Sequence, residues 1–178
     1  MPPIVPASLA SAVEGVAPAF TAREFRDAMG QFATGVVVIS TEVDGDAHAM
    51  TANAFMSGSL EPPLVLVSVA CTARMHEKIR AAQHFGVSVL AQGQLHVSSH
   101  FAGRPVDGFA PDFDRLQGLP VIRDAAVHVA ARLEHAYPCG DHTLYVGRVL
   151  AVRGRSEKPP PLLYHGGRYA AAQPMAAC

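Results

Sequence analysis

The chain has 178 residues, of which 49% are hydrophobic and 16% charged, and its formal net charge is −1. This length fits one domain with a substantial core, and the lack of a basic field excludes nucleic acid as a default partner. No apolar stretch is long enough to span a membrane and the first 20 residues lack the basic start of a signal peptide, so we expect a soluble, cytoplasmic protein without a membrane partner.

The three cysteines, Cys71, Cys139 and Cys178, form no CxxC pair, and their number is odd. Both facts argue against a disulfide framework. Cys71 ends an apolar run, and we interpret it as a small packing residue rather than a nucleophile.

Residues 1–20 are expected to form a loose N-terminal arm, residues 21–171 one domain and residues 172–178 a C-terminal tail. The domain begins with a capping box, in which Thr21 supplies the N-cap hydroxyl and Glu24 the carboxylate three residues on. Apolar residues at helical spacing follow, and Gly35 is a plausible end for this helix. The apolar stripe, which we expect to pack on a sheet, comprises Phe25, Ala28, Met29 and Phe32.

Residues 36–41 are mostly β-branched and predict a buried strand, after which Asp44-Gly45 predicts a hairpin turn. Residues 64–70 predict another buried strand. Before it, Glu61-Pro62-Pro63 is expected to block further pairing, because proline has no N–H to donate to the ladder.

The intervening segment, residues 48–63, is rich in small polar residues where a buried strand would be apolar. Short side chains and glycine allow a ligand to approach the backbone closely, but a strand with a solvated outer face would have the same composition. Both interpretations stay open from this segment alone. The residues concerned are Thr51, Asn53, Ser57, Gly58 and Ser59.

Residues 74–82 and 94–103 predict two short helices, with a strand at residues 85–91 between them. Residues 104–124 contain repeated Gly and Pro and predict an irregular segment, which at this length is usually functional or mobile.

The last part of the chain predicts a half-buried strand from Val127, a turn at residues 138–141, a long strand at residues 142–153 and one short strand at residues 162–169. One face of the long strand would carry Leu144, Val146, Leu150 and Val152, and the other Tyr145, Gly147 and Val149. Strands outnumber helices and most links are hairpin-like. The fold class is therefore mainly β, with a closed or nearly closed antiparallel barrel and covering helices.

Motif searches exclude a Rossmann dinucleotide fold and a P-loop, since neither GxGxxG nor GxxxxGK[ST] occurs. His96 and His100 share a predicted helix face, but spacing places no third metal ligand, so we favour two half-exposed histidines near an interface over a metal site. Gly140-Asp141-His142 either holds an imidazole at a cleft or forms a polar turn. Residues 164–169 suit a flat anionic ligand or a surface turn.

Several short motifs occur in an order that covers nearly the whole chain, and this ordered set resembles the flavin reductase components of two-component flavin-dependent monooxygenases. The motifs are Phe32-Ala33-Thr34-Gly35-Val36-Val37-Val38, Met50-Thr51-Ala52-Asn53-Ala54-Phe55, Ser59-Leu60-Glu61-Pro62-Pro63-Leu64-Val65, Phe85-Gly86-Val87-Ser88-Val89-Leu90, residues 140–149 and Pro161-Leu162-Leu163-Tyr164.

The resemblance implies an antiparallel split β-barrel that binds FAD or FMN at a homodimer interface, takes electrons from NADH or NADPH and supplies reduced flavin to a separate monooxygenase. It implies that His142 and Tyr169 are candidates for contact with the nicotinamide, Tyr169 being counted with the cofactor-binding residues. The other implied flavin-binding residues are Thr51, Ala52, Asn53, Ala54, Ser57, Gly58, Ser59 and Leu60, then Thr72, Ala73 and Arg74 near the phosphate, then Phe101, Ala102, Gly103 and Phe109 at the pocket edge.

Three positions depart from the family pattern, namely Ala54 in place of Ser, Met75 in place of Thr, and Gly108 in place of a basic residue. They leave the choice between FMN and FAD open. Two alternative functions also stay open: a self-contained split-barrel enzyme of the pyridoxamine-phosphate oxidase type, and a non-enzymatic flavin-binding protein.

Overall fold

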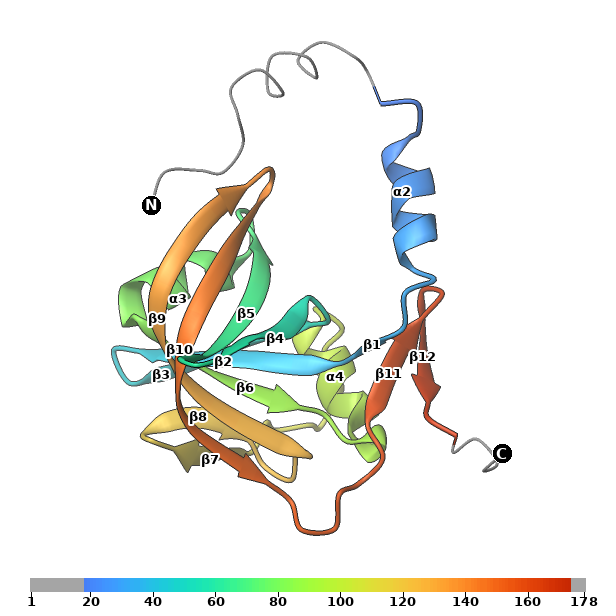
Figure 1. The fold of residues 1–178 in the computed structure, drawn as a ribbon. Coiled ribbons are helices and arrows are strands. Elements are labelled where there is room, and N and C mark those ends of the chain that lie inside the picture. Colours follow the sequence, from blue (N-terminus) through green and yellow to red (C-terminus); the bar gives the residue numbers. More distant parts are fainter. Residues whose placement is uncertain (1–17, 174–178) are drawn as a thin grey trace.

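The computed structural model describes residues 18–173 (Figure 1), so most of the expected N-terminal arm and residues 174–178 of the expected tail lie outside the described residues. The helices are α2 (Ala22–Met29), α3 (Arg74–Ala82), η1 (Gln92–Gln94) and α4 (Leu95–Phe101). The strands are β1 (Thr34–Gly35), β2 (Val37–Val43), β3 (Asp46–Ala52), β4 (Phe55–Leu60), β5 (Pro63–Ala70), β6 (His84–Val89), β7 (Phe113–Leu116), β8 (Leu119–Ile122), β9 (Val127–Cys139), β10 (His142–Gly154), β11 (Leu162–His165) and β12 (Arg168–Ala171).

The main sheet has seven antiparallel strands in the order β3-β2-β6-β9-β10-β5-β4. Strands β1, β11 and β12 form a second sheet, and β7 pairs with β8 in a third. Met50 of β3 and Phe55 of β4 pack against the same core although their strands are the two edges of the main sheet, which shows that the sheet is curled. The predicted mainly β, antiparallel fold is confirmed.

Strand β2 is buried on both faces, which explains its continuous β-branched sequence. Val37 and Ile39 face a core cluster that includes Phe85, Tyr145 and residues of α3. Val36, just before β2, and Val38 face a second cluster, which packs against α4 and the β11–β12 hairpin.

Helix α2 begins with the predicted capping box: Glu24 N–H donates to Thr21 Oγ1 over 3.2 Å, and Thr21 N–H donates to the Glu24 carboxylate over 2.7 Å. The predicted end at Gly35 is wrong, because the helix ends at Met29 with Gly30 as C-cap. The predicted packing of its apolar stripe is also wrong within the described chain. No residue of α2 is buried, and the helix stands away from the main sheet (Figure 1).

Three strand predictions need correction. The prolines do not end pairing, since Pro63 begins β5 and pairs with Leu60. The segment predicted to be irregular contains the β7–β8 hairpin, and the single last strand is in fact the β11–β12 hairpin.

Strand β10 keeps the predicted alternation, with Tyr145 and Val149 on one face and Leu150 and Val152 on the other. Tyr145 is fully buried and Val149 packs on the core, whereas Leu150 and Val152 are exposed. Two irregularities, at Val146/Gly147 and Val149/Ala151, shift the register of its pairing with β9.

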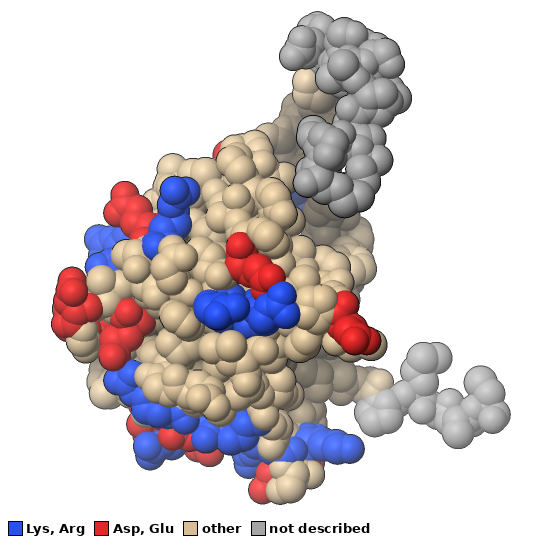
Figure 2. Space-filling view, turned by 60° about the vertical axis from the view of Figure 1, so that its left-hand side comes forward, with Lys and Arg blue, Asp and Glu red and all other residues tan. Residues whose placement is uncertain are grey.

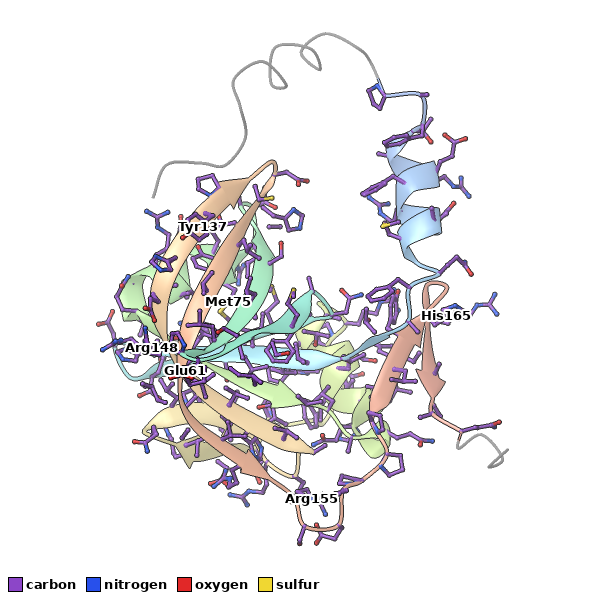
Figure 3. The ribbon with its side chains drawn as sticks, in the orientation of Figure 1. Glu61, Met75, Tyr137, Arg148, Arg155 and His165 are labelled. Carbon is purple, nitrogen blue, oxygen red and sulfur yellow. The ribbon has the colours of Figure 1, made fainter. Side chains whose placement is uncertain are left out.

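The outward side of β4, β5, β10 and β9 is largely apolar. Met56, Leu66 and Val146 lie opposite one another across three strands, and Tyr137 lies opposite Leu144. These positions alternate with the core-facing residues of the same strands. Figure 3 shows Tyr137 near the tip of the β9–β10 hairpin. Met56 and Tyr137 are 58% and 52% exposed, so this apolar face has no cover within residues 18–173.

The same side carries a partly buried ion pair. Arg148 donates two hydrogen bonds to the Glu134 carboxylate, over 2.6 and 2.5 Å, and these lower the pKa of Glu134. Elsewhere, Figure 2 shows acidic and basic side chains interspersed around a broad uncharged area. Within residues 18–173, no helix is both long and apolar enough to cross a membrane.

Candidate functional site

A cavity of about 320 Å³ lies between the end of β3, the end of α4 and the β11–β12 hairpin. This volume is at the lower end of the range for small-molecule sites, roughly 300–1,000 Å³. Its lining residues are Val36, Thr51, Ala52, Asn53, Ala102, Arg104, Tyr164, Gly167 and Tyr169.

The β3 wall of the cavity is the end of an edge strand. Strand β3 pairs only with β2, so alternate backbone N–H and C=O groups face away from the sheet and are available to a ligand. The structure therefore brings the predicted residues Thr51, Ala52 and Asn53 to the cavity. Thr51 also has a structural bond, because its hydroxyl donates to the Ser98 carbonyl over 2.8 Å.

Ser98 of α4 joins two walls of the cavity. Its carbonyl accepts from Thr51, and its fully buried hydroxyl lies 2.9 Å from the Tyr169 hydroxyl. The predicted residue Tyr169 is therefore held at the cavity by α4. Sequence analysis did not single out Ser98, and nothing in its local sequence indicates bonds to residues so distant along the chain.

The C-terminal end of α4 forms a Schellman motif. Gly103, with φ of +80°, donates its N–H to the His100 carbonyl over 3.3 Å, and Arg104 N–H donates to the Ser99 carbonyl over 3.1 Å. A side chain at position 103 would strain this left-handed conformation. The role of the predicted residue Gly103 is thus to turn the chain so that Ala102 and Arg104 both line the cavity.

The aromatic wall comes from the β11–β12 hairpin. The rings of Tyr164 and Tyr169 meet edge to face with centroids 5.5 Å apart. Both rings pack on the second core cluster, which fixes them from behind. At the hairpin tip, Gly166 N–H donates to the Gly30 carbonyl over 2.7 Å, so the hairpin also contacts the end of α2.

A second group of predicted residues gathers at the end of β5. The Ala54 carbonyl accepts from Ser68 N–H of that strand over 3.0 Å, and residues 72–74 follow the strand directly. His142 pairs with Ala70, the last residue of β5. These predicted residues, Ala54, Thr72, Ala73, Arg74 and His142, are not among those that line the cavity.

His142 makes a defined contact at this end of the sheet. Its Nδ1 lies 2.7 Å from the Asp141 carboxylate, which can only accept, so Nδ1 carries the proton. This hydrogen bond lowers the pKa of Asp141. Neighbouring Cys71, interpreted as a small packing residue, is exposed, and its Sγ lies 3.8 Å from Thr143 Oγ1.

The remaining predicted residues lie on β4 and around α4. The β4 residues run along the strand away from Ala54, and Leu60 at the end of β4 is 93% exposed. Gly58 sits in a bulge where an added Cβ would clash with Leu66 Cδ1, so a larger residue there would displace the end of the Leu66 side chain. The β4 residues are Ser57, Gly58, Ser59 and Leu60.

Phe101 and Phe109 support the site from the second core cluster, and neither lines the first cavity. His96 and His100 share a face of α4, as predicted, and both rings pack on Phe109 with centroids 5.1 Å away. Phe109 and His96 also line a second cavity of about 250 Å³.

Two of the cavity residues that sequence analysis missed are Arg104 and Val36. Arg104 lies in the segment predicted to be irregular, where its charge was the only signal. Tyr164 and Gly167 were noted as part of the aromatic and glycine-rich cluster at residues 164–169 but were not assigned to the flavin site.

Comparison with known proteins identifies the family. Residues 29–173 match the model of the flavin reductase like domain. An NADH-dependent flavin reductase of Rhodococcus sp. is 45% identical over 135 residues, which cover 74% of this chain and 77% of the relative. The reductase component of 4-hydroxyphenylacetate 3-monooxygenase from Thermus thermophilus is 43% identical over 79% of this chain and 89% of its own length.

A solved structure gives the same result. The flavin reductase PheA2 in its native state superposes with a TM-score of 0.84 at 43% identity, covering 87% of this chain and all of that one. The chain therefore belongs to the flavin reductase-like family.

The cavity suits part of a flavin. A flat ring needs an apolar or aromatic wall, which Val36, Tyr164 and Tyr169 supply. Its polar edge needs donors and acceptors, which the free edge of β3 supplies.

Proposed function

We propose that this protein is an NADH-dependent flavin reductase that supplies reduced flavin to a separate monooxygenase. The observation that carries the proposal is the cavity in which a free strand edge faces two fixed tyrosine rings. Family membership and the names of the relatives support it. In this proposal, residues 21–171 form the functional domain. The protein would work in the cytoplasm, where NADH is available.

When both ligands are bound, NADH supplies a hydride to the flavin, so the protein has to align two flat rings and needs no side chain as acid or base. Thr51, Ala52 and Asn53 would bind the polar edge of the flavin ring. Tyr169, held by Ser98, would pack against a ring of either ligand. His142 would position the nicotinamide through Nε2, because Nδ1–H is bonded to Asp141.

The active form in this proposal is a homodimer. Two apolar surfaces of the described chain have no cover: Phe25 and Met29 of α2, and the outward side of β4, β5, β10 and β9. Exposed apolar surface on this scale is typical of an interface. Light scattering should give twice the chain mass of 18.7 kDa, and the double variant Met56→Lys/Tyr137→Lys should shift the protein toward monomer.

The proposed reaction is tested by steady-state oxidation of NADH and NADPH, each with FMN, FAD and riboflavin. Flavin-dependent oxidation of NADH is the expected result. If no flavin stimulates oxidation, the proposal is wrong. A flavin that stays bound while another small substrate is oxidised would favour the self-contained enzyme. A flavin that nicotinamides do not reduce anaerobically would favour the non-enzymatic protein.

The location of the site is tested by filling the cavity. Ala102→Phe places a ring at the lining and should raise the KM for flavin by about tenfold or more, since a flat ligand loses contact along one wall. Ala47→Phe is the matched control, because Ala47 is an exposed residue near the opposite end of β3. Equal effects of the two variants would place the flavin elsewhere.

A further inference from the structure

The cavity contains one strongly charged group. Arg104 is the only Lys, Arg, Asp, Glu or His among its lining residues, so the cavity has a positive potential. Its other polar groups are hydroxyls, one amide and backbone. A ligand that carries a negative charge is therefore favoured over a neutral ligand of the same shape.

The guanidinium of Arg104 is available to such a ligand. Among residues 18–173, six of the other eleven arginines form an ion pair or donate a side-chain hydrogen bond, whereas the Arg104 side chain makes neither contact. Binding an anion would therefore break no existing pair. Because guanidinium presents a planar fork of N–H donors, its preferred anions are carboxylate and phosphate.

The backbone of Arg104 is fixed although its side chain is exposed. The Schellman bonds from Gly103 and Arg104 to the last turn of α4 determine where residue 104 leaves the helix. Helix α4 is in turn joined to β3 and β12 through Ser98. The backbone of Arg104 is thus held by the same helix that holds Thr51 of β3 and Tyr169 of β12. A positive charge is also favoured at the C-terminal end of a helix.

We propose that Arg104 is the residue with which the cavity binds the phosphate ester of its ligand. The inference rests on the proposed function, because the ligands of that reaction bring phosphate from two sources. One is the 5′-phosphate of FMN, or the pyrophosphate of FAD, and the other is the pyrophosphate of NADH. In either case, Arg104 makes the site discriminate by charge and not only by ring shape.

The test compares FMN with riboflavin, two ligands with the same ring that differ by one phosphate. Binding to the full-length chain is measured by quenching of flavin fluorescence, and NADH binding by the change in its own fluorescence. In the wild type, FMN should bind more tightly than riboflavin, and added salt should reduce the difference. Arg104→Gln should weaken FMN binding by about tenfold or more and leave riboflavin binding unchanged, as for the loss of a charge-assisted hydrogen bond.

If the phosphate that Arg104 binds belongs to NADH, Arg104→Gln should instead weaken NADH binding by a similar factor. It should then change the affinities for FMN and riboflavin equally. Either pattern supports the inference. Unchanged binding of all three ligands would overturn it. Arg80→Gln is the matched control, because Arg80 is an exposed arginine of α3 outside the lining of this cavity and should change none of these affinities.

Two further results separate this inference from the proposed function. Arg104→Lys keeps the charge without the fork and should retain an intermediate preference for FMN over riboflavin. Because the readout is binding, a wild-type protein that discriminates between FMN and riboflavin but oxidises no NADH would contradict the proposed reaction alone. A protein that oxidises NADH normally, and in which Arg104→Gln changes the binding of neither FMN nor NADH, would contradict the role of Arg104 alone.

Discussion

Helices α2 and α3 are nearly equal in length, at 8 and 9 residues, and both carry apolar side chains at helical spacing. Helix α3 buries Met75 and Ile79 in the main core. Helix α2 buries nothing, and its Phe25 and Met29 are 54% and 55% exposed. The periodicity of a sequence therefore predicts which face of a helix is apolar, but it does not predict whether the same chain covers that face.

The largest expected effect lies in α3. Ile79→Ala removes a fully buried side chain from the core and should lower the free energy of unfolding by about 2–5 kcal/mol. Chemical denaturation monitored by circular dichroism measures it. Ala81→Gly, at a more exposed position of the same helix, is the control and should cost about 1 kcal/mol. Equal losses would mean that α3 does not anchor the core.

The corresponding change in α2 should act on assembly. Phe25→Ser combined with Met29→Ser removes apolar area that nothing else in residues 18–173 covers. We expect dimer dissociation at concentrations at least tenfold higher than for the wild type, with an unchanged circular dichroism spectrum of the β strands. Concentration-dependent light scattering measures this. A dimer as tight as the wild type would show that α2 lies outside the interface.

The difference between buried and exposed groups also affects titration, as His128 illustrates. His128 is 5% exposed and donates from Nε2 to the Ile122 carbonyl over 2.7 Å, and its burial lowers its pKa below the usual 6.5. As the pH falls through 6.5, the unfolded chain binds a proton that the folded chain does not, so the folded state loses stability. Urea unfolding between pH 7.5 and about 5 should show this loss. His128→Gln should make the decline shallower, and parallel curves for the two proteins would contradict the role of His128.

The smallest expected effect is at the start of α2. Thr21→Ala removes the N-cap hydroxyl and should cost the helix about 1 kcal/mol. Since α2 is not packed on the core, the loss should appear as faster amide hydrogen exchange in α2 with little change in global unfolding. Thr21→Ser, which keeps a capping hydroxyl, should restore the wild-type exchange. A large shift of the unfolding midpoint would show that α2 is part of the cooperative core.

Local signals explain what the sequence predicted well. The bounds of α3 follow from its spacing, and the β2–β3 hairpin follows from Asp44-Gly45, both of which have positive φ. The β7–β8 hairpin turns at Gln117-Gly118, which also have positive φ but lack the usual Asn or Asp signal. On β10, the alternation of the two faces follows from the sequence, but the irregularities in its pairing with β9 do not, because a single sequence does not indicate where they occur.

The site shows the same limit. The small polar residues of the β3–β4 segment left a ligand site and a solvated strand face both open, and only the family resemblance assigned Thr51, Ala52 and Asn53 to a flavin site. The helix end at Gly103 was predicted, but the approach of Arg104 to β3 and to the β11–β12 hairpin was not, and the link from Ser98 to Tyr169 spans 71 residues. Contacts of this kind arise only when distant elements pack, so no pattern within one segment encodes them.

The hydrogen bond from Gly166 to Gly30 ties the wall that carries the two tyrosines to the uncovered helix, and the pairing of Thr34 with Tyr164 ties it a second time. A displacement of that helix would thus be carried to the aromatic rings through two short backbone connections. If association of subunits changes the affinity of the cavity through these connections, occupancy of the cavity must strengthen association by the same factor by which association strengthens occupancy.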